Sequence, residues 1–293
     1  MLDFSKSSIY IDSRKNMNEK WRTLVNILVC VKQVPDTTEI RIDPVKKTLI
    51  RDGVPSILNT FDAFALEQAL QLKDKNPANV KIVVASMGPK QAETMLRDCL
   101  AVGANSAYLI TDRKFGGSDT YATSYILSKA MKKIEEEEGS FDMIFCGKQA
   151  IDGDTAQVGP ELAEHLGLHQ ITYAINITLN EDNTTALITR EVDEGKIVVE
   201  ARIPVLVTFT KTDDLRFASI MNKMKSKKAE IKEINYEDLE GIDDTKIGLK
   251  GSPTRVVKSF TPDVKTDGII IREDDPNEAF EKFAEELEKA KLY

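Results

Sequence analysis

Residues 26–31 read NILVCV, and this apolar run is the first of four that decide the fold. The others are KIVVASM at 81–87, AYLI at 107–110 and MIFCG at 143–147. Continuous apolar runs of this length are typical of parallel strands that are buried on both faces. Stretches with helical periodicity lie between them or follow them, at about 62–73, 91–102, 120–138 and 156–165. The alternation predicts an α/β protein with a doubly wound, mostly parallel sheet.

The pattern changes after Gly167, which is expected to end the fourth helix, as Gly103 ends the second. Alternating runs at 171–179, 186–192, 197–201 and 205–210 predict antiparallel strands or a strand that returns to the sheet. Beyond residue 211 the chain becomes highly charged, and a last helix is expected at about 277–292. We therefore divide the chain into a polar N-terminal extension (1–24), an α/β domain (25–211) and a C-terminal segment (212–293).

The composition excludes several classes of protein. With 293 residues, of which 41% are hydrophobic and 30% charged, the chain is globular in type. Its longest apolar runs are far shorter than the roughly 18 residues that cross a bilayer. A net charge of −8 argues against a nucleic-acid partner. The three cysteines, Cys30, Cys99 and Cys146, form no C-x-x-C pair, so we expect free thiols in a reducing compartment, the cytoplasm.

Two loops carry residues suited to binding an anion. In a doubly wound sheet, ligands bind beyond the carboxyl ends of the strands. The loop TDRKFGGSDTYATS at 111–124 and the loop GKQAIDGDTAQVGPE at 147–161 both follow predicted strands and both lead into predicted helices. Glycines let the backbone approach a ligand, and the helix amino termini favour negative charge. Each loop alone is also compatible with an ordinary capped connection, but the two together favour a nucleotide site.

Other motifs give little support to catalysis or metal binding. Gly147 and Lys148 are followed by Gln149, where a P-loop requires Ser or Thr, and no G-x-G-x-x-G follows the first strand. The only two histidines, His165 and His169, are separated by a glycine that is expected to end their helix, so a metal site is not expected. The sequence offers no nucleophile elbow. We expect no catalytic side chain in this chain.

The segment RFASIMNKMKSKK at 216–228 places methionines and an isoleucine among lysines. Flexible methionine surfaces adapt to partners, and a basic rim suits an acidic partner. The same composition is equally typical of a cationic helix that packs against its own domain.

The strand NILVCVK, the loop GKQAIDGDTAQVGPE and the segment RFASIMNKMK, in this order and spacing, resemble the beta subunit of electron-transfer flavoproteins. The resemblance runs from about residue 26 to the C-terminus. It implies a heterodimer with an alpha subunit, one α/β domain and a C-terminal arm that wraps the partner. It also implies an adenine nucleotide in the crevice, bound through Cys30, Asn59, Phe61, Met87, Gly147, Gln149, Asp152, Gly153, Asp154, Thr155, Gln157 and Val158.

Members of this family hold either AMP or a second FAD in that crevice. The motifs KQVPDT at 32–37, FGGSDTYATS at 115–124 and GDTAQVGPE at 153–161 resemble the bifurcating branch, which holds FAD. By that resemblance the FAD pyrophosphate and ribityl chain would contact Asp119, Thr120, Thr123 and Ser124. NADH would be the donor, and ferredoxin one of two acceptors. Thr60 departs from the family pattern, in which proline usually follows the asparagine.

The resemblance also implies a partner-docking role for the methionine-rich segment. An aliphatic side chain of this family plugs an acyl-CoA dehydrogenase or enoyl-CoA reductase type of flavin enzyme. Ile220 holds that position, with Met221, Asn222 and Met224 around it. Two alternatives stay open: a housekeeping beta subunit that keeps AMP, and an adenine-nucleotide hydrolase or ATP pyrophosphatase, because GGSDT at 116–120 is similar to the phosphate loop of that group.

Overall fold

A computed structural model describes residues 10–11, 24–36, 41–42, 49–50, 56–257 and 268–292. The chain divides into two compact units. The first comprises residues 1–42 and 49–257, and the second comprises 43–48 and 258–293. The fold and the candidate sites described below lie in the first unit.

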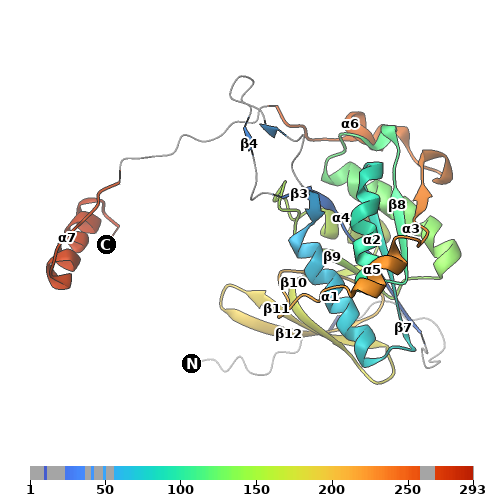
Figure 1. Ribbon diagram of the computed structural model, residues 1–293, viewed down its shortest axis with the longest axis horizontal. Coiled ribbons are helices and arrows are strands. Elements are labelled where there is room, and N and C mark those ends of the chain that lie inside the picture. The colour runs from blue at the N-terminus through green and yellow to red at the C-terminus, as the bar shows by residue number, and fades with distance from the viewer. Residues whose placement is uncertain are drawn as a thin grey trace. The chain divides into compact units, whose positions relative to one another are not determined.

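A ten-stranded sheet forms the centre of the first unit, in the order β1-β12-β11-β10-β13-β9-β2-β7-β8-β14 (Figure 1). The predicted parallel strands are β2 (Val25–Cys30), β7 (Val80–Met87), β8 (Ser106–Ile110) and β9 (Met143–Gly147). They pair side by side in parallel, with Val29 of β2 between Val84 of β7 and Phe145 of β9. The prediction of a doubly wound parallel sheet is confirmed.

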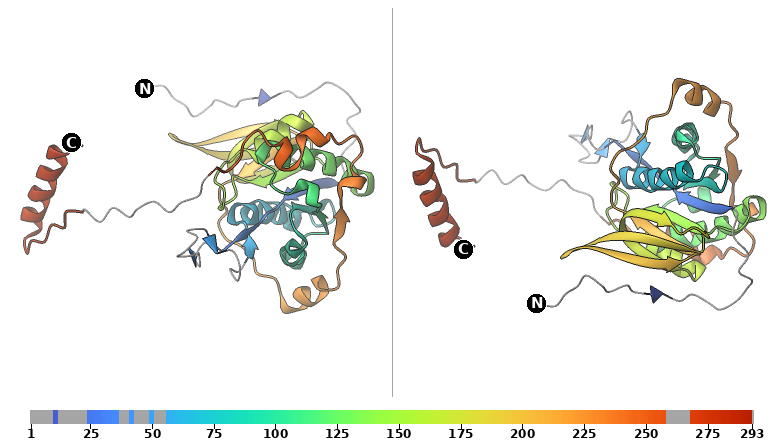
Figure 2. Two further views of the ribbon diagram at one scale, coloured as in Figure 1. Left: turned by 90° about the horizontal axis from the view of Figure 1, so that it is seen from above. Right: turned by 90° about the horizontal axis from the view of Figure 1, so that it is seen from below.

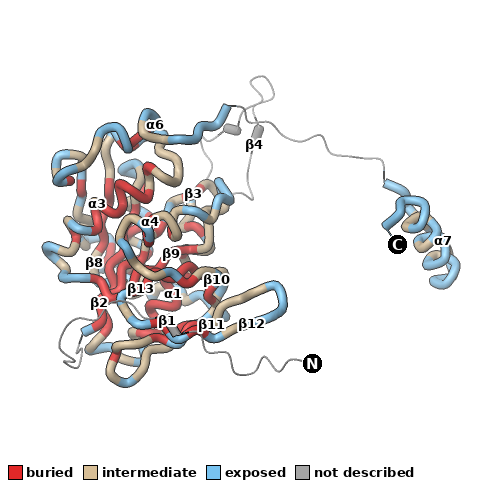
Figure 3. The backbone as a smooth tube through the Cα atoms, turned by 180° about the vertical axis from the view of Figure 1, so that it is seen from behind, coloured by how far each residue is buried: buried red, intermediate tan, exposed pale blue. Residues whose placement is uncertain are grey.

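Helices cover both faces of this sheet. One face packs against α1 (Thr60–Lys75) and α2 (Glu93–Val102), and the opposite face packs against α3 (Thr120–Glu138) and α4 (Val158–Leu166). Because strand side chains alternate between faces, Ile27 and Val29 belong to the first apolar core and Leu28 to the second. Figure 3 shows buried residues concentrated in the central strands and in the helix faces that contact them.

The second half of the chain contains both antiparallel strands and a strand that returns to the parallel sheet, the two alternatives that its sequence pattern left open. Strands β10 (His169–Leu179), β11 (Thr185–Val192) and β12 (Gly195–Arg202) pair antiparallel, and the β11–β12 hairpin projects from the body (Figure 2). Strand β13 (Val205–Phe209) then returns and lies parallel to both β10 and β9. Gly103 and Gly167 follow α2 and α4 with positive φ angles, as predicted.

Residues 212–257 belong to the same compact unit as the α/β domain. They include α5 (Ile220–Ser226), β14 (Lys232–Ile234), three short helical turns (Tyr236–Asp238, Asp244–Lys246 and α6, Gly248–Gly251) and their connections. Strand β14 extends the sheet by pairing in parallel with β8. The boundary between the two compact units lies at 257/258.

Short elements complete the description. Strand β1 (Tyr10–Ile11) pairs with β12, β3 (Gln33–Pro35) pairs with β6 (Ser56–Leu58), and β4 (Arg41–Ile42) pairs with β5 (Leu49–Ile50). In the second unit, α7 spans Pro276–Lys289, so it ends three residues before the expected limit of 292. Among the residues that the structure describes, no helix is long and apolar enough to cross a bilayer.

Candidate functional site

The order of the strands places a crevice between β2 and β9. From β2 the chain proceeds through α1 to β7, whereas the chain leaving β8 passes through α3 and enters the sheet on the other side of β2, as β9. This reversal is a topological switch point, where doubly wound sheets bind their ligands. The loop after β2 begins at Val31 and the loop after β9, one of the two loops selected from the sequence, begins at Lys148, so these two loops flank the crevice.

Asp62 joins the two strands that flank the crevice. This residue lies in the first turn of α1 and is buried. Its Oδ2 accepts a hydrogen bond from the Lys32 amide at 2.8 Å, and its Oδ1 accepts one from the Gly147 amide at 3.0 Å. Burial raises the pKa of Asp62 to about 7, against the opposing effect of hydrogen bonds from Asn59, Lys32 and Gly147. The sequence had suggested only the neighbourhood of this residue.

Asn59 holds the loop after β9 through two side-chain hydrogen bonds. Its side chain is completely buried; its Nδ2 donates to the Gln149 carbonyl at 2.8 Å and its Oδ1 accepts from the Ile151 amide at 3.1 Å. The backbone amide of Asn59 also donates to the Lys32 carbonyl at 2.9 Å. Both polar groups of this predicted ligand-binding residue are therefore engaged in holding the loop.

The loop of residues 148–157 is exposed at its tip and shaped by local contacts. Lys32 Nζ reaches across the crevice to Asp152 Oδ1 at 2.7 Å, and Gln149 Nε2 donates to Asp154 Oδ1 at 2.6 Å. Asp154 and Ala156 both have φ near +54°, in the left-handed region. These two turns place the first residue of α4 at 158, two residues after the predicted start at 156.

The amino terminus of α4 fits an anionic group. Gln157 precedes the helix and makes no side-chain capping bond, so no capping side chain occupies the first amides of α4. Gly153, within the loop, has open space where a Cβ would lie. A helix amino terminus with free amides beside a glycine-containing loop is a common site for a phosphate group. The predicted residues Asp152, Gly153, Asp154, Thr155, Gln157 and Val158 all lie on this loop or at its junction with α4.

The predicted loop at 111–124 lies close to the predicted loop at 147–161. Thr120 Oγ1, at the start of α3, donates to Glu161 Oε1 of α4 at 3.2 Å, and Ser124 Oγ contacts Glu161 Oε2 at 3.4 Å. Burial raises the pKa of Glu161. The structure therefore brings Thr120 and Ser124 together with the start of α4, while Thr123 lies in the same helical turn, partly exposed.

Asp119 has partners within the chain. Its Oδ1 caps α3 by accepting from the Ala122 amide at 3.0 Å, and its Oδ2 accepts from both the amide and the hydroxyl of Thr254 at 2.8 Å. The Asp119 amide donates to Ser252 Oγ at 2.8 Å. Burial alone would raise the pKa of Asp119, but the hydrogen bonds from Ala122 and Thr254 lower it. Ser252 and Thr254 are thus bound to Asp119, directly before α3.

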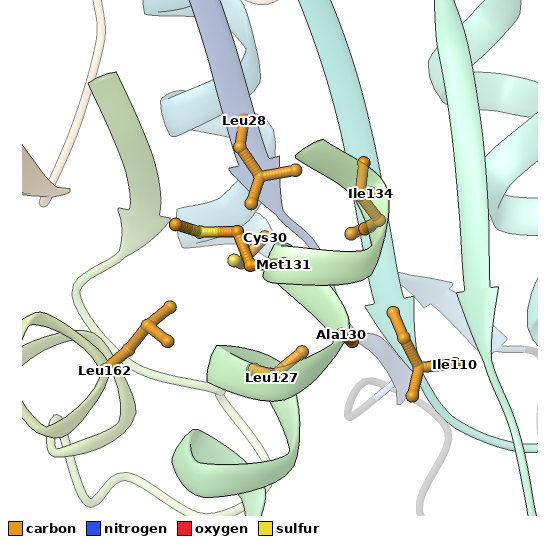
Figure 4. Close-up of a pocket in the computed structure, with 9 residues that line it drawn as sticks. Leu28, Cys30, Ile110, Leu127, Ala130, Met131, Ile134 and Leu162 are labelled. Atoms are coloured by element: carbon orange, nitrogen blue, oxygen red, sulfur yellow. The ribbon is translucent and has the colours of Figure 1, made fainter. Parts of the chain in front are cut away.

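Cys30 ends β2 at the crevice, Met87 ends the neighbouring strand β7, and both residues are partly buried. The Cys30 side chain lines an apolar space between the sheet and α3, together with Leu28, Met131 and Ile134 (Figure 4). The space is too small to hold a water molecule. This space belongs to the packed core. A hydrogen bond with Cys30 and burial together raise the pKa of Cys146, so the neutral thiol of Cys146 is an inert core group.

Two aromatic residues, of which the sequence analysis selected only Phe61, lie around Lys148 at the start of the loop after β9. Lys148 Nζ lies 5.2 Å from the ring centre of Tyr173 and 5.9 Å from that of Phe61, a predicted binding residue. Tyr173 has φ of +60°, at a bulge where the pairing of β10 with β13 shifts register. The alternation of apolar residues around position 173 carries no signal of such a bulge.

The predicted partner-binding residues lie together on α5. Ile220 is 82% exposed, Met221 64% and Met224 65%, and Asn222 is also exposed. Phe217, which the sequence analysis did not select, is 97% exposed next to them. Large apolar side chains that gather on a surface mark an interaction site. Among the residues described, no group of three or more His, Cys, Asp or Glu side chains could hold a metal ion.

Comparison with known proteins identifies the family. A model described as an electron transfer flavoprotein domain matches residues 46–239. The chain belongs to the electron transfer flavoprotein family. It is 53% identical over 257 residues to the electron transfer flavoprotein subunit beta of Megasphaera elsdenii, a match that covers 87% of this chain and 94% of the relative. The resemblance to beta subunits is thus confirmed, and the ATP pyrophosphatase alternative has no support.

More distant electron transfer flavoprotein relatives carry other names. The chain is 46% identical over 248 residues to the caffeyl-CoA reductase-Etf complex subunit CarD of Acetobacterium woodii, covering 84% of this chain and 92% of the relative. It is 45% identical over 241 residues to the protein FixA of Sinorhizobium fredii, covering 81% and 84%.

Proposed function

We propose that this chain pairs with an electron transfer flavoprotein alpha subunit and holds FAD in the crevice between β2 and β9. The free amino terminus of α4 is the observation that carries this proposal, because it fits the pyrophosphate of a dinucleotide. A flavin held there would supply the chemistry of hydride acceptance and one-electron transfer. The chain itself binds and orients.

Each group of site residues has a part in that binding. The loop containing Gln149, Asp152, Asp154, Thr155 and Gln157 surrounds the phosphate end, and Asp62 and Asn59 keep that loop at a fixed distance from β2. Thr120, Thr123 and Ser124 supply hydroxyls from α3. Met87 and the backbone of Cys30 would contact the adenosine end, since both lie at strand ends on the other flank of the crevice.

We further propose NADH as the donor, with ferredoxin and an acyl-CoA dehydrogenase or enoyl-CoA reductase type of enzyme as acceptors. The KQVPDT, FGGSDTYATS and GDTAQVGPE motifs support the bifurcating branch. The relative CarD, which belongs to a caffeyl-CoA reductase complex by name, supports a reductase of this class as partner. The apolar residues of α5 offer a docking surface for it.

The second compact unit is proposed to contact the alpha subunit. Within it, α7 begins at Pro276, and the side chain of the preceding Asp275 caps the helix. The helix exposes Phe280 and Phe283, three residues apart on one face. An amphipathic helix whose apolar face is exposed requires a partner. Free thiols at Cys30, Cys99 and Cys146 support the cytoplasm as the location of the complex.

One observation favours the housekeeping alternative with AMP. The carboxylate of Asp119, expected to contact the FAD, already accepts bonds from Ala122 and Thr254, and Ser118 Oγ accepts from the Gly248 amide. A nucleotide that stays at the β9 loop needs no contact with Asp119, whereas FAD would extend further.

The nucleotide content of the heterodimer decides between these functions. The chain should be co-expressed with its alpha subunit, and the purified complex denatured so that released FAD and AMP can be quantified. Two FAD and no AMP per heterodimer are expected, followed by NADH oxidation that depends on ferredoxin and the second acceptor. One FAD and one AMP would refute bifurcation and establish a housekeeping carrier.

A further inference from the structure

The helix α5 is too short and too exposed to be held by hydrophobic packing. It comprises seven residues, and Ser226 is its only buried member. Its apolar side chains, Ile220, Met221 and Met224, are all exposed. Isolated helices shorter than about 12 residues are marginal in water. Polar contacts from the rest of the domain must therefore keep this segment helical.

Arg97 of α2 holds the carboxyl end of α5. Its Nη1 donates to three carbonyl oxygens, those of Ser226 at 3.0 Å, Lys227 at 3.2 Å and Ala229 at 2.7 Å. The last carbonyls of a helix have no partner within the helix, and a cation there also interacts favourably with the helix dipole. A single guanidinium thus satisfies the end of α5 and fixes it against α2.

Arg216 holds the chain before α5. Its Nε and Nη2 donate to the two carboxylate oxygens of Glu67 at 2.9 and 2.8 Å, and its Nη2 also reaches Asp74 at 2.7 Å. Glu67 is buried, whereas Asp74 is 62% exposed in its side chain. Paired donation from a planar guanidinium to a carboxylate fixes direction as well as distance. The segment is thereby anchored to α1 four residues before Ile220.

We propose that Arg97 and Arg216 are positioning residues that clamp α5 at both ends and so keep its apolar side chains presented to a flavin dehydrogenase partner. This inference rests on the proposed docking function of α5. The clamp orders the docking segment before the partner arrives, so that binding does not have to order it. Neither arginine needs to touch the partner.

Hydrogen exchange of the intact heterodimer tests the clamp without any ligand. In Arg97→Met, amides of residues 223–229 are expected to exchange at least tenfold faster, while the central strands are unchanged. Arg97→Lys should give an intermediate rate, because one ammonium can replace some of the three bonds. Arg255→Met is the matched control, since Arg255 is exposed and its guanidinium makes no hydrogen bond or ion pair with the residues that the structure describes. Unchanged exchange in Arg97→Met would overturn the clamp.

The Arg216 end requires gentler variants, because removing Arg216 alone leaves Glu67 buried without its partner. Asp74→Ala removes only the exposed half of the contact, and the double variant Arg216→Met with Glu67→Gln removes the buried charge together with its partner. Both should raise exchange at residues 219–223, the double variant more strongly. If neither does, Arg216 is not part of the clamp.

Electron transfer separates positioning from chemistry. With an acyl-CoA dehydrogenase that the wild-type complex reduces or oxidises as the probe, Arg97→Met should raise the KM for that enzyme about tenfold, with kcat and nucleotide content unchanged. Faster exchange without a change in KM would overturn the role in docking. If the wild-type complex docks no such enzyme while the exchange results hold, the proposed function fails and the clamp stands.

Discussion

The carboxylate of Asp62 lies against Gly147, and the two are joined by a hydrogen bond of 3.0 Å from the Gly147 amide to Asp62 Oδ1. A Cβ at position 147 would collide with this carboxylate and with the backbone of Phe61. The glycine at the end of β9 is therefore required by its neighbours in α1 and not by its own φ angle.

Replacing Gly147 with alanine should disrupt this contact. We expect Gly147→Ala to lower the free energy of unfolding by about 1–3 kcal/mol, because the colliding atoms include backbone. Nucleotide content should fall with it. Gly153→Ala, in the same loop but facing open space, should change stability by less than about 0.5 kcal/mol. Denaturant titration of both variants checks the prediction, and equal stability for the two would refute it.

The raised pKa of Asp62 predicts a pH-dependent stability. Between the ordinary value of 3.8 and about 7, the folded state holds a proton that the unfolded state has lost. The stabilisation is thus complete below about pH 4 and is lost as the pH rises to about 7, by at most about 1.4 kcal/mol per pH unit. Asp62→Asn should lack this slope. Denaturant unfolding at pH 5, 6, 7 and 8 measures the free energy of unfolding of both proteins. The same pH dependence in the wild type and in Asp62→Asn would contradict the prediction.

Ile220 is expected to anchor the partner. Truncation to alanine should weaken docking by about 1.5–3 kcal/mol, while nucleotide content and stability stay as in the wild type, because the side chain contacts solvent. Val198→Ala is the matched control, since Val198 is also an exposed aliphatic residue but lies on the β11–β12 hairpin. Binding to an immobilised acyl-CoA dehydrogenase measures both. Loss of nucleotide in Ile220→Ala would exclude a docking role.

We expect Asp119 to contribute mainly to the stability of the fold and not to cofactor binding. Asp119→Ala removes the cap of α3, which should cost about 0.5–2 kcal/mol, and releases Thr254. Residues 248–257 should then become more sensitive to limited proteolysis. Flavin loss without any change in stability or proteolysis would instead assign Asp119 to the cofactor. Thr254→Val, which keeps the cap, isolates the effect of the released segment.

The sequence predicted the elements whose pattern is local. Buried strands and amphipathic helices each repeat an apolar period over five or more residues, so β2, β7, β8, β9 and the helices that cover them could be read directly. Strand β14 has three residues and α5 exposes its apolar face, so neither carries such a period. Both are held by contacts with distant residues, since Arg97 binds the Ser226 carbonyl of α5 and β14 pairs with β8.

The candidate site was predictable in place but not in detail. The loops beyond the strand ends could be selected because parallel strands end at one edge of the sheet. Which side chains hold the loops in place depends on long-range contacts. Asn59, for example, donates a hydrogen bond to the Gln149 carbonyl, 90 residues away in the sequence. The left-handed Tyr173 arises from a register shift with β13, which no local pattern at position 173 reveals.

The position of β13 in the sheet determines when the two halves of the sheet can pair during synthesis. Because β13 pairs with β9 and β10 at once, the strands of the first half of the chain cannot be joined to the antiparallel hairpin until residues 205–209 have left the ribosome. Until then β9 is an edge strand with unpaired backbone groups, a template for association with other chains. A chain truncated before Val205 would therefore expose the edge of β9 to other chains.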